Sequence, residues 1–217
     1  MDYDARTNDY RRHGLERDPF KSIVAPRPVG WISTVSAAGV CNLAPYSFFA
    51  AISEDPHFVM FSSGGIKDSL RNIMETGEFV CSLATWDLRE AVNLSSASVP
   101  YGVDEFPIAG LTATPSKFVK PPRVKESPAA LECRHYQTVV LPAGAKGPNY
   151  HVVIGEVIGI HLDEAFVRNG RVATGDLLPI ARLGGADYGV IRPDVVFALG
   201  RPKVDRDGTV MVKKAAD

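Results

Sequence analysis

The chain has 217 residues, of which 45% are hydrophobic and 23% are charged, and these proportions are typical of a globular domain with a sizeable core. The 24 Lys and Arg residues are balanced by 25 Asp and Glu residues, so overall charge argues against a nucleic-acid binder, although it leaves room for a local phosphate site. The polar first residues contain no signal-peptide core, and no apolar stretch has the length of a membrane helix. We therefore expect a cytoplasmic protein without membrane or nucleic-acid partners.

The cysteines support the same compartment. Cys41, Cys81 and Cys133 lie far apart and are odd in number, which favours reduced thiols over a disulfide framework. Cys133 and His135 would share one side of a strand, but no CxxC or HxxxH motif supplies the other ligands that zinc needs. We expect no metal site.

The first half of the chain is dominated by strand-like segments. Residues 29–36 and 40–47 flank a short break that contains Gly39, a pattern that indicates a β-hairpin. The apolar run 57–62 is expected to be a strand covered on both faces, and 78–84 has the same character. Residues 67–77 place Leu70, Ile73 and Met74 on one face of a short helix that Gly77 would end.

A second short helix is expected over 87–94, where Asp87 and Glu90 resemble a capping box. Residues 95–110 lack periodicity and are expected to form a long loop of the kind that often serves as a lid. Apolar and polar side chains then alternate along 130–141. One face would carry Leu131, Cys133, Val139 and Leu141, and the other Glu132, Arg134 and Thr138.

Residues 150–162 are long and β-branched, and the turn-rich linker 142–149 would join them to 130–141 as an antiparallel hairpin. Two short helices among about seven strands do not form alternating β-α units. We therefore expect a mainly β fold with an antiparallel sheet, closed as a barrel or folded as a sandwich.

No common catalytic motif is present: we find no GxSxG, no GxxxxGK[ST], no GxGxxG and no HExxH. The strongest local signal is "FSSGGIKDSLRN" (61–72), in which a strand ends in two hydroxyls and a Gly pair leads through Lys67 into a helix. Hydroxyls, a lysine and the free N–H groups of a helix start suit a phosphate dianion. The alternative is an ordinary strand-turn-helix with a Ser or Asp cap.

The stretch "VCNLAPYSFF" (40–49) interrupts a strand with polar residues and then continues with aromatic rings. Pro45 lacks an N–H, so we hypothesise that regular pairing stops there and that the backbone turns toward a ligand. A flavin has a polar pyrimidine edge, which Asn42, Ala44, Tyr46 and Ser47 could bind. Its apolar edge could face Trp31, Phe48 and Phe49, although core packing is the commoner role of such rings.

These segments, in this order, resemble the flavin reductase-like family with the FMN-binding split-barrel fold. The matching segments are "PRPVGWISTVSAAGVCNLAPYSFFAAISEDPHFVMFSS", "KDSLRNIMETGEFV", "GVDEFPIAGL", "SPAALECR", "IGEVIGIH" and "RLGGADYGVI". The resemblance covers roughly residues 20–191, so we expect one domain over 1–217 with extensions at both ends. It implies a six-stranded antiparallel Greek-key barrel, with a few short helices, that assembles as a homodimer and holds FMN near the subunit interface.

The resemblance also implies which residues bind the cofactor. Those expected around the isoalloxazine and ribityl groups are Thr34, Asn42, Ala44, Pro45, Tyr46, Ser47 and Phe48. Those expected to hold the phosphate are Ser62, Ser63, Lys67 and Ser69, where many relatives have Thr in place of Ser69. A late motif, with Arg182 and Tyr188, would also approach the flavin. No catalytic side chain is named.

The implied activity is that of an oxidoreductase in which NADH or NADPH reduces FMN or FAD. The reduced flavin then reduces an acceptor or is passed to a partner monooxygenase. Two alternatives stay open. One is a flavoprotein oxygenase that acts on an organic substrate, and the other is a non-enzymatic FMN-binding electron carrier.

Overall fold

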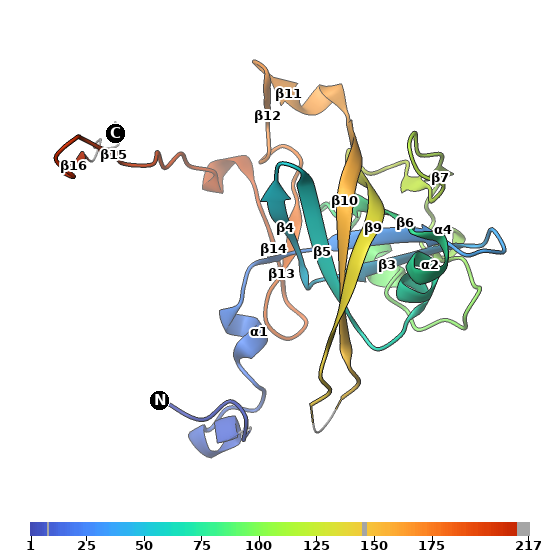
Figure 1. Cartoon of the computed structure of the whole chain (residues 1–217), viewed down its shortest axis with the longest axis horizontal. Helices are drawn as coiled ribbons and strands as arrows, with labels where there is room; N and C mark the ends of the chain where they lie inside the picture. Colours follow the sequence, from blue (N-terminus) through green and yellow to red (C-terminus); the bar gives the residue numbers. More distant parts are fainter. Residues whose placement is uncertain (8, 145–146, 212–217) are drawn as a thin grey trace.

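The structure is a computed structural model that describes residues 1–7, 9–144 and 147–211. Its main feature is one antiparallel sheet of seven strands in the order β3-β2-β6-β9-β10-β5-β4. The strands are β2 (Gly30–Val35), β3 (Cys41–Tyr46), β4 (Phe49–Glu54), β5 (His57–Gly64), β6 (Glu78–Leu83), β9 (Ala129–Leu141) and β10 (Tyr150–Leu162). Figure 1 shows β4, β5, β10 and β9 in front of β2 and β3, which run across them.

The sheet closes on itself through a very short connection. Its two edge strands, β3 and β4, follow each other in the chain with only Ser47 and Phe48 between them. The Ser62 amide in β5 also donates to the Phe48 carbonyl at 2.9 Å, which ties this corner to the opposite edge. The mainly β split-barrel fold is confirmed, with seven strands in the sheet rather than the six that the resemblance implied.

The expected end of pairing at Pro45 is wrong. Pro45 lies opposite Trp31, and the β2–β3 pairing continues to Tyr46 opposite Gly30. Because β3 is an edge strand, a residue without an N–H costs no hydrogen bond on its open side. The sharp change of direction comes one residue after the strand, at Ser47 and Phe48.

Trp31 and Phe49 lie in the core. Trp31 is fully buried with Leu43, Val92, Phe106 and other apolar residues in a cluster separate from the one that contains Ile32. Phe49 packs on the core of the barrel, where its ring lies so close to Gly30 that a Cβ there would be 2.5 Å from Phe49 Cδ2. Gly30 therefore lets the chain pack closely after the turn at Ser47 and Phe48.

The helices are short and lie beside the sheet. The expected helix at 67–77 is confirmed as α2 (Asp68–Thr76), which packs on β2 and ends at Gly77 with φ 75°. The helix expected at 87–94 begins later, as α3 (Arg89–Leu94). Its N-cap is Leu88 without a side-chain hydrogen bond, so the expected capping box is absent among the described residues.

The expected loop 95–110 contains a further helix, α4 (Glu105–Ile108). Asp104 caps it by accepting a hydrogen bond from the Phe106 amide. Among the described residues no helix has the length and apolar character that crossing a membrane requires. The helical elements that remain are η1 (Asp9–His13), α1 (Phe20–Ile23), η2 (Glu164–Phe166) and η3 (Pro193–Val195).

Small sheets complete the fold. β1 (Arg27–Pro28), β13 (Ile180–Arg182) and β14 (Tyr188–Val190) form a three-stranded sheet. The short pairs are β7 (Ala113–Thr114) with β8 (Arg123–Val124), β11 (Val167–Arg168) with β12 (Arg171–Val172), and β15 (Lys203–Val204) with β16 (Val210–Met211). The two ends of the chain extend away from the barrel (Figure 1).

The long hairpin of β9 and β10 is confirmed, with two register shifts along it. Glu132, expected on the polar face, is buried, and its carboxylate accepts hydrogen bonds from the amides of Lys117 and Phe118. Val139 and Leu141, expected on the inner face, are exposed near the end of the hairpin. Part of the expected linker 142–149, residues 145–146, lies outside the described residues.

Candidate functional site

A cavity of about 730 Å³ lies where β3, β5, the start of α2 and the segment after α3 meet. Its volume is within the range of small-molecule and cofactor sites. It gathers nine of the thirteen expected binding residues. These nine are Asn42, Ala44, Pro45, Tyr46, Ser47, Phe48, Ser62, Lys67 and Ser69.

The other four expected residues do not line this cavity. Thr34 and Ser63 are fully buried behind its wall, where the Ser63 hydroxyl donates to the Gly65 carbonyl at 2.9 Å. Arg182 and Tyr188 lie in the β13–β14 hairpin and are paired with each other at 2.8 Å. Thr34 and Ser63 therefore cannot contact a ligand in the cavity directly.

The first turn of α2 forms one end of the cavity. Lys67 occupies the N-cap in an extended conformation, and none of the described side chains caps the helix, so the Ser or Asp cap of the alternative is not found there. Lys67 is exposed, lines the cavity and forms no ion pair with any described residue. The free N–H groups of a helix start, next to an ammonium group, provide a favourable position for an anion.

Tyr46 gives independent support for a polar ligand at this end. The residue is only 7% exposed and lines the cavity, yet its hydroxyl has no hydrogen-bond partner among the described residues. Burial raises the pKa of Tyr46, so its hydroxyl is a neutral donor. The nearby hydroxyls of Ser69 and Ser63 oppose this rise in pKa, but neither forms a hydrogen bond with the Tyr46 hydroxyl. A buried hydroxyl rarely stays without a partner, and a ligand oxygen would supply one.

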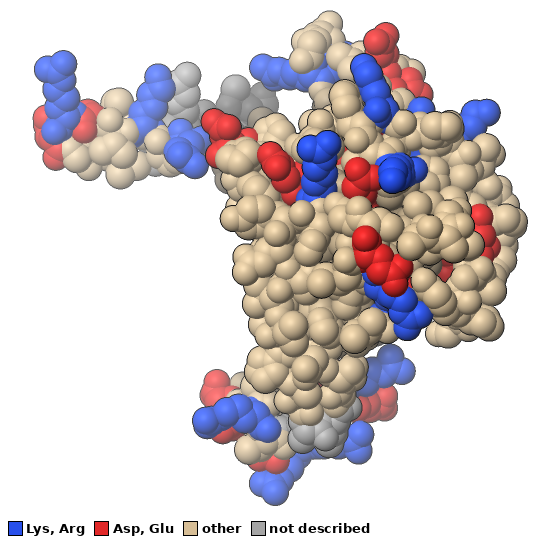
Figure 2. Space-filling model, turned by 45° about the vertical axis from the view of Figure 1, so that its right-hand side comes forward, with Lys and Arg blue, Asp and Glu red and all other residues tan. Residues whose placement is uncertain are grey.

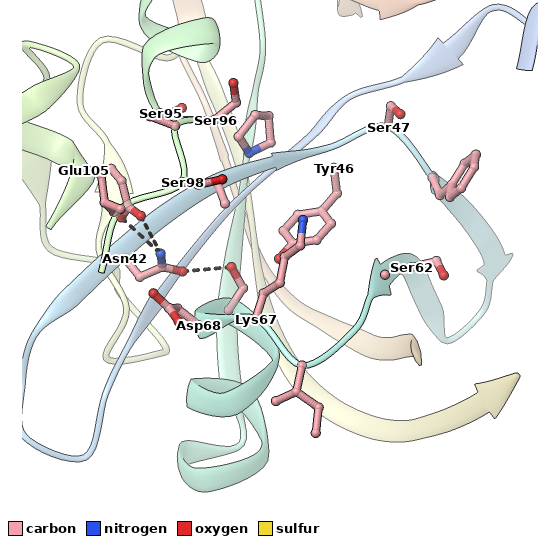
Figure 3. Close-up of a pocket in the computed structure, with 18 of the residues that line it drawn as sticks. Asn42, Tyr46, Ser47, Ser62, Lys67, Asp68, Ser95, Ser96, Ser98 and Glu105 are labelled. Atoms are coloured by element: carbon pink, nitrogen blue, oxygen red, sulfur yellow. Dashed lines mark hydrogen bonds between the residues drawn. The ribbon is translucent and has the colours of Figure 1, made fainter. Parts of the chain in front are cut away.

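A buried hydrogen-bond network supports the same wall (Figure 3). Asn42 Nδ2 donates to both carboxylate oxygens of Glu105 at 3.0 Å, and the Leu43 amide donates to Glu105 Oε2 at 2.8 Å. Asn42 Oδ1 accepts from Ser69 Oγ at 2.8 Å and from Thr34 Oγ1 at 3.2 Å. The Asn42 side-chain amide, expected to bind the flavin edge, thus already forms hydrogen bonds with Glu105, Ser69 and Thr34.

Glu105 is the buried charge of this network. It is 4% exposed, and no Lys, Arg or His among the described residues forms an ion pair with it. Burial raises the pKa of Glu105, while the hydrogen bonds from Leu43 and Asn42 oppose that shift and the negative Asp68 adds to it. The carboxylate therefore positions β3 from within the wall.

One rim of the cavity is less polar. Phe48 faces Tyr150 across a ring-centroid distance of 6.1 Å, and Ile66 and Pro148 lie along the same rim. The guanidinium of the buried Arg27 lies 5.9 Å from the Phe48 ring on the protein side. The cavity thus combines an anion-binding position with an apolar rim, and this combination suits FMN, which carries both an anionic phosphate and an apolar dimethylbenzene group.

Sequence reasoning missed part of the lining. The segment Ser95–Val99 forms one wall, and the Ser95 hydroxyl is held there by the Trp31 indole N–H at 2.9 Å. Glu105 also lines the cavity; it lies in the segment "GVDEFPIAGL", which carries part of the resemblance, but no sequence pattern identifies it as a wall residue. The remaining lining residues are Gly64, Ile66 and Asp68, which lie within the segment 61–72 that the sequence indicates as a phosphate site, and Pro148 and Tyr150, which were not expected.

The cysteines offer no reactive thiolate. All three are free, and burial raises the pKa of Cys81 to about 12 and that of Cys133 well above its usual value. In the described part of the chain, His, Cys, Asp and Glu side chains form no group of three that could hold a metal ion.

Comparison with known proteins agrees with this geometry. Residues 23–175 match a family model described as a flavin reductase like domain. An uncharacterised protein of Aquifex aeolicus is 37% identical over 174 residues, which span 76% of this chain and 85% of that protein.

Solved structures give the same picture. Nitrilotriacetate monooxygenase component B from Bacillus cereus superimposes with a TM-score of 0.82 at 28% identity, over 92% of this chain and 98% of that one. The 2-nitrobenzoate 2-nitroreductase of Pseudomonas fluorescens shares the fold, with a TM-score of 0.76 at 24% identity over the whole of both chains.

Proposed function

This chain belongs to the flavin reductase-like domain family, and from that premise we propose that it is an FMN-dependent oxidoreductase that takes electrons from NADH or NADPH. The observation that carries the proposal is the cavity at the start of α2, where an uncapped helix, Lys67 and the unpartnered Tyr46 hydroxyl converge. FMN is favoured over riboflavin because this end of the cavity suits a phosphate.

The protein's part is to bind and orient. The first turn of α2 and Lys67 would hold the phosphate, while the Tyr46 hydroxyl would donate to a ligand oxygen. Phe48, Ile66 and Tyr150 would exclude water from the apolar edge of the ring. FMN held there would supply the redox chemistry, which is two-electron exchange between a nicotinamide and a second acceptor. No nucleophile is required for this reaction.

The next question is which molecule receives the electrons of the reduced flavin. Component B of nitrilotriacetate monooxygenase is among the similar structures, so we propose that reduced flavin is passed to a partner oxygenase. The three free thiols suit a reducing compartment, and we propose a cytoplasmic location on that ground.

We also propose that the chain forms a homodimer. Tyr136, Val139, Val140, Leu141 and Tyr150 expose apolar surface along the end of the β9–β10 hairpin, next to the cavity rim. Figure 2 shows that the middle of one face carries few charged side chains, whereas Lys, Arg, Asp and Glu lie above it and below it. A second copy would cover apolar surface that is otherwise open to water. Light scattering should give the mass of two chains; the mass of one chain would contradict the dimer.

Steady-state oxidation of NADH and of NADPH, followed with added FMN and then with riboflavin, tests the activity. We expect turnover with at least one nucleotide and a lower KM for FMN than for riboflavin. No turnover with either nucleotide would contradict the reductase. Bound FMN that is reduced by a protein donor but not by NADH or NADPH would indicate an electron carrier, and an oxygenated organic product found by mass spectrometry would indicate an oxygenase.

A further inference from the structure

Thr34 lies directly behind the cavity wall and takes part in its hydrogen-bond network. It is 0% exposed in β2 and does not line the cavity, so it cannot touch a ligand there. Its hydroxyl nevertheless donates to Asn42 Oδ1 at 3.2 Å, the same atom that accepts from Ser69. Asn42 Oδ1 therefore has two donors, of which only Ser69 also faces the cavity.

The direction of these hydrogen bonds follows from Glu105. An ionised carboxylate can only accept, so the Asn42 side chain must turn its NH₂ group toward Glu105 and its oxygen toward Ser69 and Thr34. The Ser69 hydrogen then points at Asn42. Without a ligand, Ser69 offers only a lone pair to the cavity.

Asn72 determines which way the Thr34 hydrogen points. Asn72 Nδ2, in α2, donates to Thr34 Oγ1 at 3.0 Å and occupies an acceptor site of that hydroxyl. The Thr34 hydrogen remains for Asn42, the acceptor that the hydrogen-bond geometry gives it. Thr34 is thus a buried donor whose direction is determined by protein groups alone.

We propose that Thr34 is a positioning residue that makes the cavity selective for a phosphorylated flavin, because it frees the Ser69 hydroxyl to donate to the phosphate. Turning the Ser69 O–H toward an anion requires no movement of heavy atoms. Asn42 Oδ1 keeps Thr34 as its donor when Ser69 turns away. Without the Thr34 hydroxyl, the same rotation would leave a buried amide oxygen without a partner.

The inference rests on the proposed function, and it differs from a plain packing role in one measurable respect. A packing role of Thr34 would affect FMN and riboflavin equally, because the two ligands share their ring and ribityl chain. The positioning role affects only the ligand that carries the phosphate.

The test compares dissociation constants for FMN and riboflavin, measured by flavin fluorescence on the full chain. Thr34→Val removes the hydroxyl, and Thr34→Ser is the matched variant that keeps it. We expect T34V to bind FMN roughly tenfold more weakly than T34S, the effect of leaving one buried acceptor without a donor, and to bind riboflavin as T34S does. T34S should resemble the wild type.

Ser69→Ala provides the coupling test. Once the Ser69 hydroxyl is absent, Thr34 has no donor to free, so T34V should add no further loss of FMN affinity in the S69A background. Should T34V fold poorly, as judged by its melting temperature, Thr34→Cys keeps a similar volume with only a weak donor and is expected to show the same FMN-specific loss.

Three results would overturn the inference: equal losses for FMN and riboflavin in T34V, no loss for either ligand, or an undiminished effect of T34V in the S69A background. These are distinct from failure of the proposed function, which would appear as a wild-type chain that binds neither ligand and would remove both proposals.

Discussion

Glu105→Ala should destabilise the fold because it removes an acceptor that two buried donors share. The Leu43 amide and Asn42 Nδ2 both donate to this carboxylate, and all three residues are buried. An orphaned buried donor costs about 1–3 kcal/mol, so two would cost about 2–6 kcal/mol. Burial opposes ionisation of Glu105, as the raised pKa shows, so removal of the carboxylate recovers part of this cost. We expect a net loss of about 2–3 kcal/mol in the free energy of unfolding.

Urea unfolding followed by circular dichroism measures this loss. Glu75→Ala is the matched control, since Glu75 is an exposed residue of α2, and it should change the unfolding free energy by no more than about 0.5 kcal/mol. If E105A were as stable as E75A, the carboxylate would not support β3 and the network would not have the role given to it.

Three further outcomes are expected. Burial raises the pKa of Glu105 above its ordinary value of 4.5, so the folded chain keeps the Glu105 proton to higher pH than the unfolded chain does. This difference in proton binding stabilises the folded chain fully below pH 4.5, and the stabilisation is lost as the pH rises through the folded pKa. Melting temperatures of Glu105→Gln relative to wild type should therefore rise across that interval and then level off, whereas a flat difference would contradict the raised pKa. Lys67→Met should weaken FMN binding about fivefold at low salt and less at high salt, with little effect on riboflavin binding. A loss of FMN affinity that does not depend on salt would argue against an ionic contact. Gly30→Ala should lower the free energy of unfolding in urea by about 1–3 kcal/mol, since its Cβ would lie 2.5 Å from the Phe49 ring. Gly189→Ala is the control and should lower it much less, because the nearest atom to its Cβ would be 3.7 Å away. Equal losses would show that the close packing at Gly30 is unimportant.

Local patterns were enough to predict much of the barrel. The hairpin over 29–47 and the helix that ends at Gly77 follow from alternation, helical periodicity and turn residues, and the structure contains them as β2, β3 and α2. The resemblance led to nine of the residues that line the cavity. All nine come from two continuous stretches, 42–48 and 62–69, in which a strand and the chain that follows it approach the same space.

What the sequence did not predict depends on contacts between distant segments. Glu105 reaches Asn42 across 63 positions, and no local pattern distinguishes a carboxylate that will be buried from one on a surface. Pro45 was expected to stop pairing, but its place on an edge strand, which only the complete sheet order reveals, removes the conflict. The capping box expected at Asp87 fails because α3 begins after Leu88.

The central claim is that FMN binds with its phosphate at the first turn of α2. A crystal structure of the chain with FMN tests it most directly. We expect the phosphate within hydrogen-bond distance of the α2 amides and near the Lys67 ammonium, with the Tyr46 hydroxyl donating to a ligand oxygen. A phosphate bound elsewhere, or a cavity that contains only water at saturating FMN, would contradict the claim.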